Sequence, residues 1–362
     1  MRTSVAALAL LLVTTGSCST AGDQEATPPE DDSVPSGQSL TPGSSSAPGE
    51  STEEGRAKGG SSPTQRPARA PHPVSLPALM EHEYDGRGLR LGRETASTDA
   101  YVTHQVTYRS GELTISGLMN LPRGSGPFPA LVLAHGYIDP DIYATGQGLR
   151  REQDHLARAG YVTLHVDYRN HAGSDDDPAA DRRLRLGYTE DVINAVHALR
   201  GWRAGPVDGD RIGLVGRSMG GGIVYNVLTV APGLVDAGVV FAPVSSDTVD
   251  NFDRWIRPDP GRAGLADEIV SRYGAPDEAP GFWRRVSPRT YFDRVTEPVM
   301  IHHGTLDDSC PIDWSRRTVR ALRAEGKQVR FHVYEGEQHA FGPQWPLSMR
   351  RTVDFLDRHL DG

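Results

Sequence analysis

Residues 212–221 of the chain read IGLVGRSMGG, and this stretch decides the fold. It opens with a short apolar run, which predicts a strand that is buried on both faces. Gly216 and Gly220 flank Ser218, and glycines allow the close backbone approach that a very tight turn requires. A helix is predicted directly afterwards, over residues 219–228. The stretch therefore predicts a serine hydroxyl raised on a sharp strand-to-helix turn, at the sheet edge where α/β proteins bind ligands.

Outward from this turn, the chain alternates between predicted strands and predicted helices. Strands are predicted at residues 130–134, 161–166, 211–215, 237–241, 298–302 and 329–334, and helices at 149–159, 188–199, 219–228, around Val319 and Leu322, and at 349–360. A hairpin with alternating polarity, residues 101–109 and 113–121, precedes them. We therefore expect an α/β fold with a mostly parallel central sheet, an antiparallel hairpin at its N-terminal edge and helices on both faces.

One long segment, residues 244–291, interrupts the alternation after the sixth predicted strand. It is rich in aromatic residues and proline, and Trp255 and Trp283 are its two tryptophans. Long insertions of this kind often form lids over binding sites. We predict a lid in which these two side chains contact substrate, with a packed surface excursion as the alternative. Arg169, which follows the strand at 161–166, is a further candidate for substrate contact.

A serine hydroxyl needs a base to become a nucleophile. Strand–Ser–helix turns of this form are typical of α/β-hydrolases, in which an acid and then a histidine follow the serine along the chain. Asp307 follows the predicted strand at 298–302, and His339 is in the loop after the last strand. We predict Ser218 as nucleophile, His339 as base and then acid, and Asp307 as the carboxylate that orients the histidine. The adjacent Asp308 is the alternative acid.

The negatively charged intermediate of such a reaction needs two backbone N–H donors, which form the oxyanion hole. The first donor comes from the residue after the nucleophile, which is Met219. The second comes from the turn after the first central strand. That turn reads His135-Gly136-Tyr137, and we predict the N–H of Tyr137 as the donor, with His135 in a structural role.

The stretches VLAHGY, DYRNHAGSD, VDGDRIGLVGRSMGGG, SPRTYFDRVTEPVMIHHGTLDDSCP and YEGEQHAF occur in this order over residues 132–341. In them the chain resembles the catalytic domain of the prolyl oligopeptidase family and its esterase relatives. The resemblance implies hydrolysis of an acyl bond through an acyl-serine intermediate, without a cofactor. It places the family's serine, acid and histidine on Ser218, Asp307 and His339.

We expect the substrate to be a small-molecule ester or a short peptide, and two departures of this chain from that family bear on the choice. Its peptidases usually carry an N-terminal β-propeller, which this sequence does not contain, and they commonly have Tyr where this chain has Met219. Both departures favour an esterase, with a dipeptidyl or acylaminoacyl peptidase as the alternative. Acyl transfer by the same intermediate, and a surface binding protein without catalysis, are further alternatives.

The first residues predict an export signal, with Arg2 before an apolar run at residues 5–13. The small residues before Cys18 resemble the processing box of bacterial lipoproteins, which implies a lipid on Cys18; a plain cleaved signal peptide is the alternative. We expect a lipoprotein signal peptide at residues 1–18, a disordered Ser/Gly/Pro-rich tether at 19–77 and the catalytic domain at 78–362. The protein would then be exported and anchored to the outer face of the cytoplasmic membrane.

Composition and charge exclude few other classes of function. The 362 residues carry a formal net charge of −9, and no basic segment predicts nucleic-acid binding. Of two cysteines, Cys18 and Cys310, only the second lies in the predicted domain, so no disulfide is expected there. The acidic run at residues 175–177 lacks the surrounding pattern of a cation-binding loop. We expect neither a metal nor a cofactor.

Overall fold

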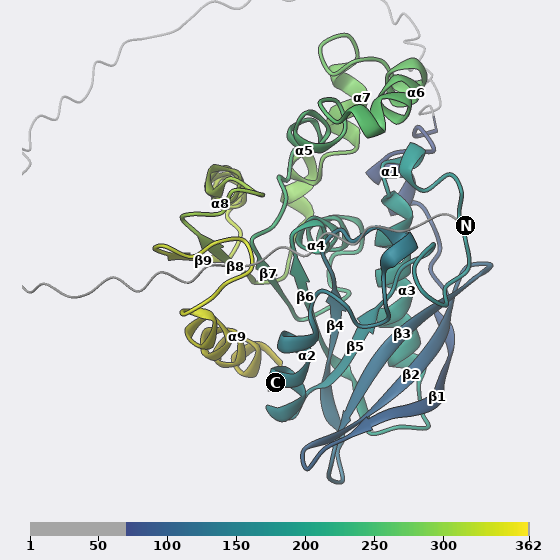
Figure 1. The fold of residues 1–362 in the computed structure, drawn as a ribbon, viewed down its shortest axis with the longest axis vertical. Coiled ribbons are helices and arrows are strands. Elements are labelled where there is room, and N and C mark those ends of the chain that lie inside the picture. Colours follow the sequence, from purple (N-terminus) through teal and green to yellow (C-terminus); the bar gives the residue numbers. More distant parts are fainter. Residues whose placement is uncertain (1–69, 361–362) are drawn as a thin grey trace, which may run out of the picture. The chain divides into compact units, whose positions relative to one another are not determined.

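The computed structural model describes residues 70–360, which form one central sheet covered by helices (Figure 1). The strands are β1 (Arg87–Ser97), β2 (Tyr101–Ser110), β3 (Leu113–Pro122), β4 (Phe128–Ala134), β5 (Val162–Val166), β6 (Val207–Arg217), β7 (Ala237–Phe241), β8 (Val299–Gly304) and β9 (Val329–Tyr334). Their order across the sheet is β1-β2-β3-β5-β4-β6-β7-β8-β9. Strands β1, β2, β3 and β5 pair antiparallel, and β5, β4 and β6 to β9 pair parallel.

The helices are α1 (Leu76–Met80), α2 (Arg150–Arg158), α3 (Leu186–Gly201), α4 (Met219–Val230), α5 (Thr248–Trp255), α6 (Ala263–Tyr273), α7 (Pro280–Arg285), α8 (Ile312–Ala324) and α9 (Trp345–Leu360), with short 3₁₀ segments η1 (Pro140–Ile142), η2 (Asp181–Arg183), η3 (Pro260–Arg262) and η4 (Pro288–Arg294). Apolar side chains of α2 and α9 pack on one face of the sheet. Those of α1, α3, α4 and α8 belong to the larger core on the other face. This arrangement confirms the predicted α/β class with helices on both faces.

Burial explains why the central strands were predictable. Strands β5, β7 and β8 are buried along their whole length, and the last five residues of β4 are buried too. Strands covered on both faces read as continuous apolar runs. The sheet edge at which the parallel strands end then gathers the loops that follow β4, β6, β8 and β9.

Strand β1 was not predicted, because its residues are exposed except for Leu89 and show no alternation of polarity. It is an edge strand with irregular register against β2. Its presence makes β7 the seventh strand, so the insertion at residues 244–291 follows strand seven and not strand six.

The predicted boundary between tether and domain is corrected by α1. Val74 and Leu76 are buried in the core, and the side chain of Ser75 caps this helix by accepting from the N–H of Ala78. Residues 70–77 therefore belong to the folded domain. The signal peptide and the remainder of the predicted tether lie outside the described residues.

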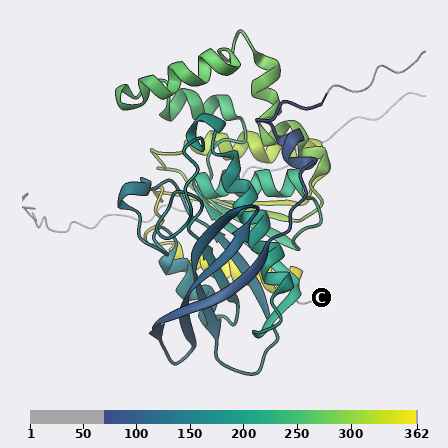
Figure 2. The same cartoon turned by 90° about the vertical axis from the view of Figure 1, so that its right-hand side faces the viewer.

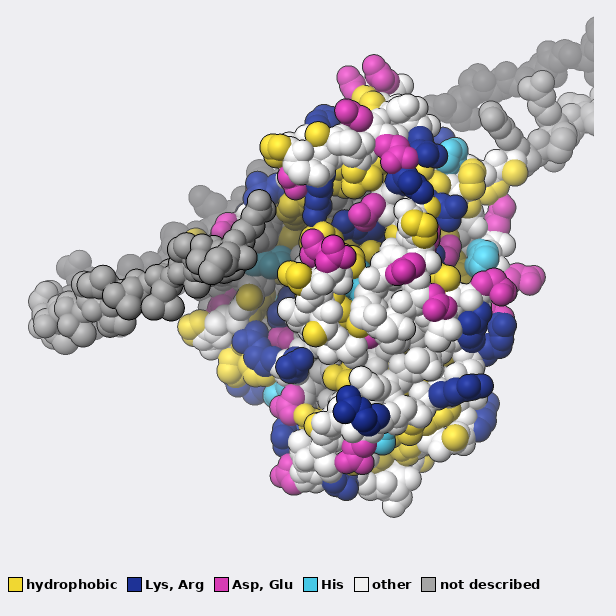
Figure 3. Space-filling view, turned by 45° about the vertical axis from the view of Figure 1, so that its right-hand side comes forward, with side chains coloured by type: hydrophobic (Ala, Val, Ile, Leu, Met, Phe, Trp, Pro, Cys, Tyr) yellow, Lys and Arg dark blue, Asp and Glu magenta, His cyan; other side chains and the backbone are white. Residues whose placement is uncertain are grey.

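The insertion folds as α5, η3, α6, α7 and the first part of η4, with these helices at one end of the molecule and β1–β3 at the other (Figures 1 and 2). Its aromatic residues mostly pack on one another, as Phe282 does against Tyr273 at 4.4 Å between ring centroids. Acidic and basic side chains are interspersed on the face drawn in Figure 3. Among residues 70–360, no helix is both long enough and apolar enough to span a bilayer.

Candidate active site

The turn between β6 and α4 has the sharp, tight geometry that sequence analysis predicted, and its backbone is strained at Ser218. Ser218 has a positive φ of 55° with ψ of −119°, a conformation that non-glycine residues adopt rarely. A Cβ on Gly216 would overlap the carbonyl of Gly220, and a Cβ on Gly220 would overlap the carbonyl of Ala134. Gly216 is therefore required within the turn, and Gly220 is required where α4 approaches the end of β4. The turn leaves Ser218 partly exposed at the carboxyl end of β6, where it lines a cavity.

The predicted acid and base meet at the same edge of the sheet. Nδ1 of His339 lies 2.9 Å and 3.1 Å from the two carboxylate oxygens of Asp307. The side chain of Asp307 is fully buried, whereas that of His339 is 24% exposed. The ring is thus held by a buried carboxylate on one side and is open on the other. Asp308 makes no such contact, and its backbone carbonyl accepts from Arg254 instead.

A second histidine, His303, supports the carboxylate from behind and was missed by the sequence analysis. Its Nε2 lies 3.2 Å from Oδ2 of Asp307 and 2.8 Å from the carbonyl of Cys310, and its Nδ1 lies 2.7 Å from the hydroxyl of Ser315. His303 is fully buried at the end of β8. Its position four residues before Asp307, at the end of a strand, was the available signal.

These contacts keep Asp307 ionised. Burial by itself raises the pKa of the carboxyl group, but hydrogen bonds from His303, from His339 and from the backbone N–H of Cys310 at 2.8 Å more than reverse that effect. The net result is a pKa well below the usual range for Asp. A carboxylate that stays charged can fix the tautomer of His339 and stabilise its protonated form.

Ser218 and His339 line the same cavity. The hydroxyl oxygen of Ser218 lies 3.9 Å from the thiol sulfur of Cys310, and within residues 70–360 it makes no hydrogen bond to the His339 ring. Catalytic hydrogen bonds are often long in the absence of substrate and shorten when it binds. The Ser218–His339 step of the triad, and with it the assignment of all three residues, stays a prediction.

The predicted oxyanion donors are placed on either side of the serine. Met219 is the first residue of α4, where N–H groups have no acceptor within the helix. The turn after β4 packs against the nucleophile so closely that a Cβ on Gly136 would lie 3.1 Å from Cβ of Ser218. Tyr137, the next residue, lines the cavity with Met219. This placement suits the two predicted N–H donors, which also stay a prediction.

The cavity in front of Ser218 has a volume of about 460 Å³. The insertion supplies much of its wall, with Thr248, Asn251, Phe252, Trp255, Ile256 and Arg262 among the lining residues. Trp255 lines the cavity, and its predicted contact with substrate stays a prediction.

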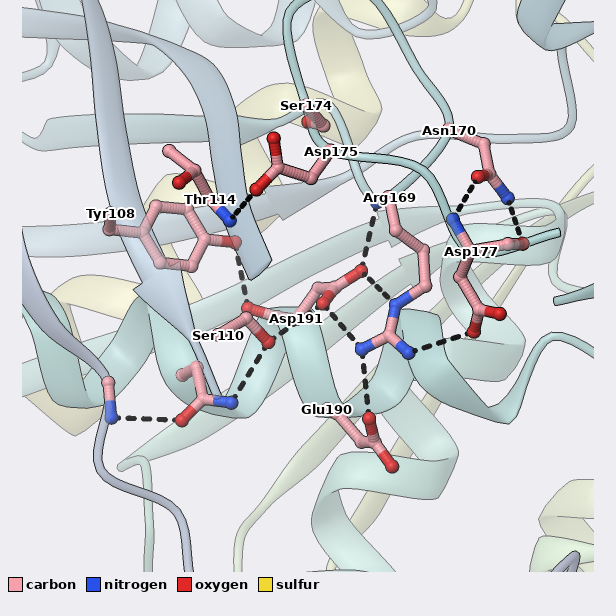
Figure 4. Close-up of polar contacts among 12 residues, drawn as sticks. Tyr108, Ser110, Thr114, Arg169, Asn170, Ser174, Asp175, Asp177, Glu190 and Asp191 are labelled. Carbon is pink, nitrogen blue, oxygen red and sulfur yellow. Dashed lines mark hydrogen bonds and ion pairs between the residues drawn. The ribbon is translucent and has the colours of Figure 1, made fainter. Parts of the chain in front are cut away.

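Two other predicted substrate contacts are corrected. Trp283 is buried, packs against Phe252 at 4.8 Å between ring centroids and donates to the carbonyl of Gly274, so it belongs to the core of the insertion. Arg169 is also buried and does not line the cavity. Its guanidinium bonds to Asp191 and Glu190 of α3 at 2.8 Å and to Asp177 at 3.3 Å (Figure 4). These pairs give Arg169 a structural role between the loop after β5 and α3.

Among residues 70–360, no group of three or more His, Cys, Asp or Glu side chains is arranged to hold a metal ion. Cys310 is a buried free thiol, and burial, with the nearby charge of Asp307, raises its pKa well above the usual value. A thiol in this state is a poor nucleophile.

Comparison with known families identifies the chain. The model of the prolyl oligopeptidase family matches residues 147–362, more than half of the sequence and the part that contains the serine, the acid and the histidine. The chain belongs to this family. It is accordingly a serine hydrolase with an α/β-hydrolase fold.

Two curated relatives are peptidases. Dipeptidyl aminopeptidase BIII of Pseudoxanthomonas mexicana is 26% identical over 247 residues, which is 63% of this chain and 34% of the relative. The acylamino-acid-releasing enzyme of Arabidopsis thaliana is 26% identical over 204 residues, 52% of this chain and 25% of the relative. The chain thus spans about a third or less of the length of these relatives.

Solved structures of both peptidases and esterases share the fold. The acylaminoacyl peptidase of Pyrococcus horikoshii has a TM-score of 0.58 at 22% identity, with 73% of this chain and 42% of that chain covered. Acetyl xylan esterase 1 of Thermoanaerobacterium has a TM-score of 0.56 at 18% identity, with 75% and 88% covered. At these identities the likeness concerns the fold alone.

Proposed function

We propose that this protein is a serine peptidase that cleaves the peptide or amide bond of short substrates with an apolar residue beside the scissile bond. The observation that carries the proposal is the cavity that contains both Ser218 and the Asp307-paired His339, in a chain of the prolyl oligopeptidase family. The peptidase names of the curated relatives support this alternative better than the esterase activity that the sequence analysis favoured.

The proposed reaction has two steps. Ser218 Oγ attacks the carbonyl carbon while its proton passes to Nε2 of His339, and the oxyanion is held by the N–H groups of Tyr137 and Met219. The C–N bond then breaks as the imidazolium gives its proton to the leaving amine. Water, deprotonated by the same imidazole, attacks the acyl-serine, and the proton returns to the serine oxygen as the acid is released.

The walls of the cavity indicate the substrate class. Phe252, Trp255 and Ile256 supply an apolar surface from the insertion. The charged groups are paired with each other, because Arg185 bonds to Asp181 at 2.6 Å and Arg262 to Asp259 at 3.4 Å. Both guanidiniums also lie over the ring of Tyr137, at 4.4 Å and 4.8 Å from its centroid.

A wall of this kind offers an apolar surface and paired charges, so substrate selection is proposed to depend on apolar contact more than on net charge. Cleavage of carboxylic esters by the same acyl-serine route is the second candidate function. The same arrangement of Ser218, His339 and Asp307 suits both reactions, which differ in whether the leaving group is an amine or an alcohol.

We predict that aminoacyl, N-acetyl-aminoacyl or dipeptidyl p-nitroanilides with Leu or Phe at the scissile bond are hydrolysed faster than matched substrates with Asp or Lys. Release of p-nitroaniline measures the rates, with p-nitrophenyl acetate as the ester and the Ser218→Ala protein as the blank. Turnover of the ester with no amide cleaved would replace the peptidase proposal by an esterase. Product analysis with added amine acceptors separates hydrolysis from acyl transfer.

We further propose that the protein is exported and held at the membrane by lipid on Cys18, which lies outside the described residues. In a bacterial expression host, the full chain should incorporate radiolabelled palmitate and partition into detergent, because several acyl chains on one residue anchor a protein firmly. Cys18→Ser should abolish the label, and Cys310→Ser should leave it unchanged. Labelling that persists in Cys18→Ser contradicts the anchor.

A further inference from the structure

A buried carboxylate on α2, outside the predicted triad, connects the serine turn to the histidine loop. The side chain of Glu152 is 1% exposed. Its Oε1 accepts from Arg217 at 2.6 Å, from the indole N–H of Trp345 at 2.7 Å and from Arg151 at 3.3 Å. The three donors come from three different parts of the chain: the end of β6, the start of α9 and α2 itself.

The first donor belongs to the nucleophile turn. Arg217 is the last residue of β6 and directly precedes Ser218. Its guanidinium is 13% exposed, and its Nε has no hydrogen-bond partner among the described residues. The bond to Glu152 is thus the polar contact that fixes this side chain. A buried cation without that carboxylate would be costly.

The other two donors, Arg151 on α2 and Trp345 at the start of α9, connect Glu152 to the histidine loop. Arg151 donates two hydrogen bonds, both of 3.1 Å, to the carbonyl of Phe341, which is two residues beyond His339. Its guanidinium also lies 4.4 Å from the ring centroid of Trp345, where α9 begins after this loop. Helices α2 and α9 contact each other on the same face of the sheet (Figure 1).

We propose that Glu152 is a positioning residue that sets the separation between Ser218 and His339 by holding Arg217, Arg151 and Trp345 on one carboxylate oxygen. The proposal rests on the proposed catalytic roles of Ser218 and His339. Glu152 contacts neither the substrate nor the reacting atoms. It therefore acts only through the nucleophile turn and the histidine loop, which carry Ser218 and His339. A displacement of about 1 Å between reacting groups can lower a rate by about 10²-fold.

A purely structural role makes a different prediction from a positioning role. A structural carboxylate would change the melting temperature, and activity would follow the folded fraction. A positioning carboxylate changes kcat of the fully folded protein, with little change in KM, because substrate contacts in the cavity are unaltered. A variant that regains stability without regaining the carboxylate therefore distinguishes the two roles, because only a positioning role then leaves kcat low.

The experiment compares Glu152→Gln with the double variant Glu152→Gln/Arg217→Met, both assayed well below their melting temperatures. In the single variant kcat should fall about 10²-fold with KM within about threefold of wild type. The double variant leaves no buried cation unpaired, so its melting temperature should recover toward wild type while kcat stays low. Recovery of kcat together with stability would overturn the proposal, as would an unchanged kcat in Glu152→Gln.

The matched control is Glu297→Gln. Glu297 is also buried, and it accepts backbone N–H groups from Gly233 at 2.6 Å and Thr296 at 3.0 Å, at the opposite end of β8 from Asp307. This variant should lose stability and keep kcat within about twofold. An equal loss of kcat in the control would mean that any buried charge has this effect, and the proposal would be wrong.

The rate of fluorophosphonate labelling of the serine serves as the second readout, because it does not depend on knowing the substrate. It should fall in both Glu152 variants and not in Glu297→Gln. Wild-type protein that labels but cleaves no amide or ester overturns the proposed substrates, whereas equal labelling rates in wild type and Glu152→Gln overturn the positioning role.

Discussion

Replacing Ser218 with Ala should lower kcat for any cleaved amide or ester by about 10⁶-fold and should abolish covalent labelling by a fluorophosphonate. The physical reason is that the hydroxyl is the atom that forms the acyl bond, and no other described side chain can replace it. Cys310 is the nearest alternative, at 3.9 Å, but its raised pKa keeps the thiol protonated. Stopped assays of product release and mass spectrometry of the labelled protein measure the two effects.

Ser246→Ala is the control for this substitution. Ser246 is a buried serine whose hydroxyl pairs with that of Thr318 at 2.7 Å and which does not line the cavity. Its loss should cost stability but leave the labelling stoichiometry at one per chain. Full labelling of Ser218→Ala would mean that another residue is the nucleophile, and the assignment of Ser218 would be discarded.

The sequence predicted the strands and turns of the candidate catalytic edge because each element there has a strong local signal. The central strands are continuous apolar runs. Around Ser218, glycine is required at positions 216 and 220, because a Cβ at either position would overlap neighbouring backbone atoms. The acid and the histidine could be chosen because each follows a predicted strand, in the chain order that the fold requires. Sequence analysis preferred Asp307 to the adjacent Asp308, and in the structure it is Asp307 that contacts His339.

What the sequence could not supply depends on long-range packing. Trp283 and Arg169 were candidates because aromatic and basic residues near a binding edge often contact substrate. In the structure Trp283 donates to a backbone carbonyl of the insertion and Arg169 pairs with Asp191, so both side chains make contacts inside the fold. The supporting role of His303 depends on the direction of a side chain at the end of β8, which strand periodicity alone does not fix. Glu152 has no sequence signal, since two of its three partners, Arg217 and Trp345, are 65 and 193 residues away.

Replacing Asp307 with Asn should lower kcat by about 10⁴-fold while leaving the fold intact, because an amide offers the wrong hydrogen-bonding groups to the Nδ1 side of His339 and cannot stabilise the imidazolium. KM should change little, since the side chain is buried behind the ring and does not face the cavity. Steady-state kinetics on the best substrate of the amide and ester panel measures both parameters. Asp308→Asn removes the same charge one residue later and should retain most of the activity. A larger loss in Asp308→Asn than in Asp307→Asn would reverse the assignment of the acid.

The same substitution should change how stability depends on pH. The pKa of Asp307 is lowered in the folded state, so its ionised form contributes stability at pH values above about 4, the ordinary Asp value, and this contribution is lost as the pH falls through the lowered folded-state pKa. Wild-type protein should therefore lose melting temperature below about pH 4 more steeply than Asp307→Asn, which has no proton to take up at this position. Melting curves between neutral pH and about pH 2.5 test this difference. Parallel curves for the two proteins would show that the carboxylate is not held in its charged form by His303 and His339, and the charge stabilisation assigned to Asp307 would then be wrong.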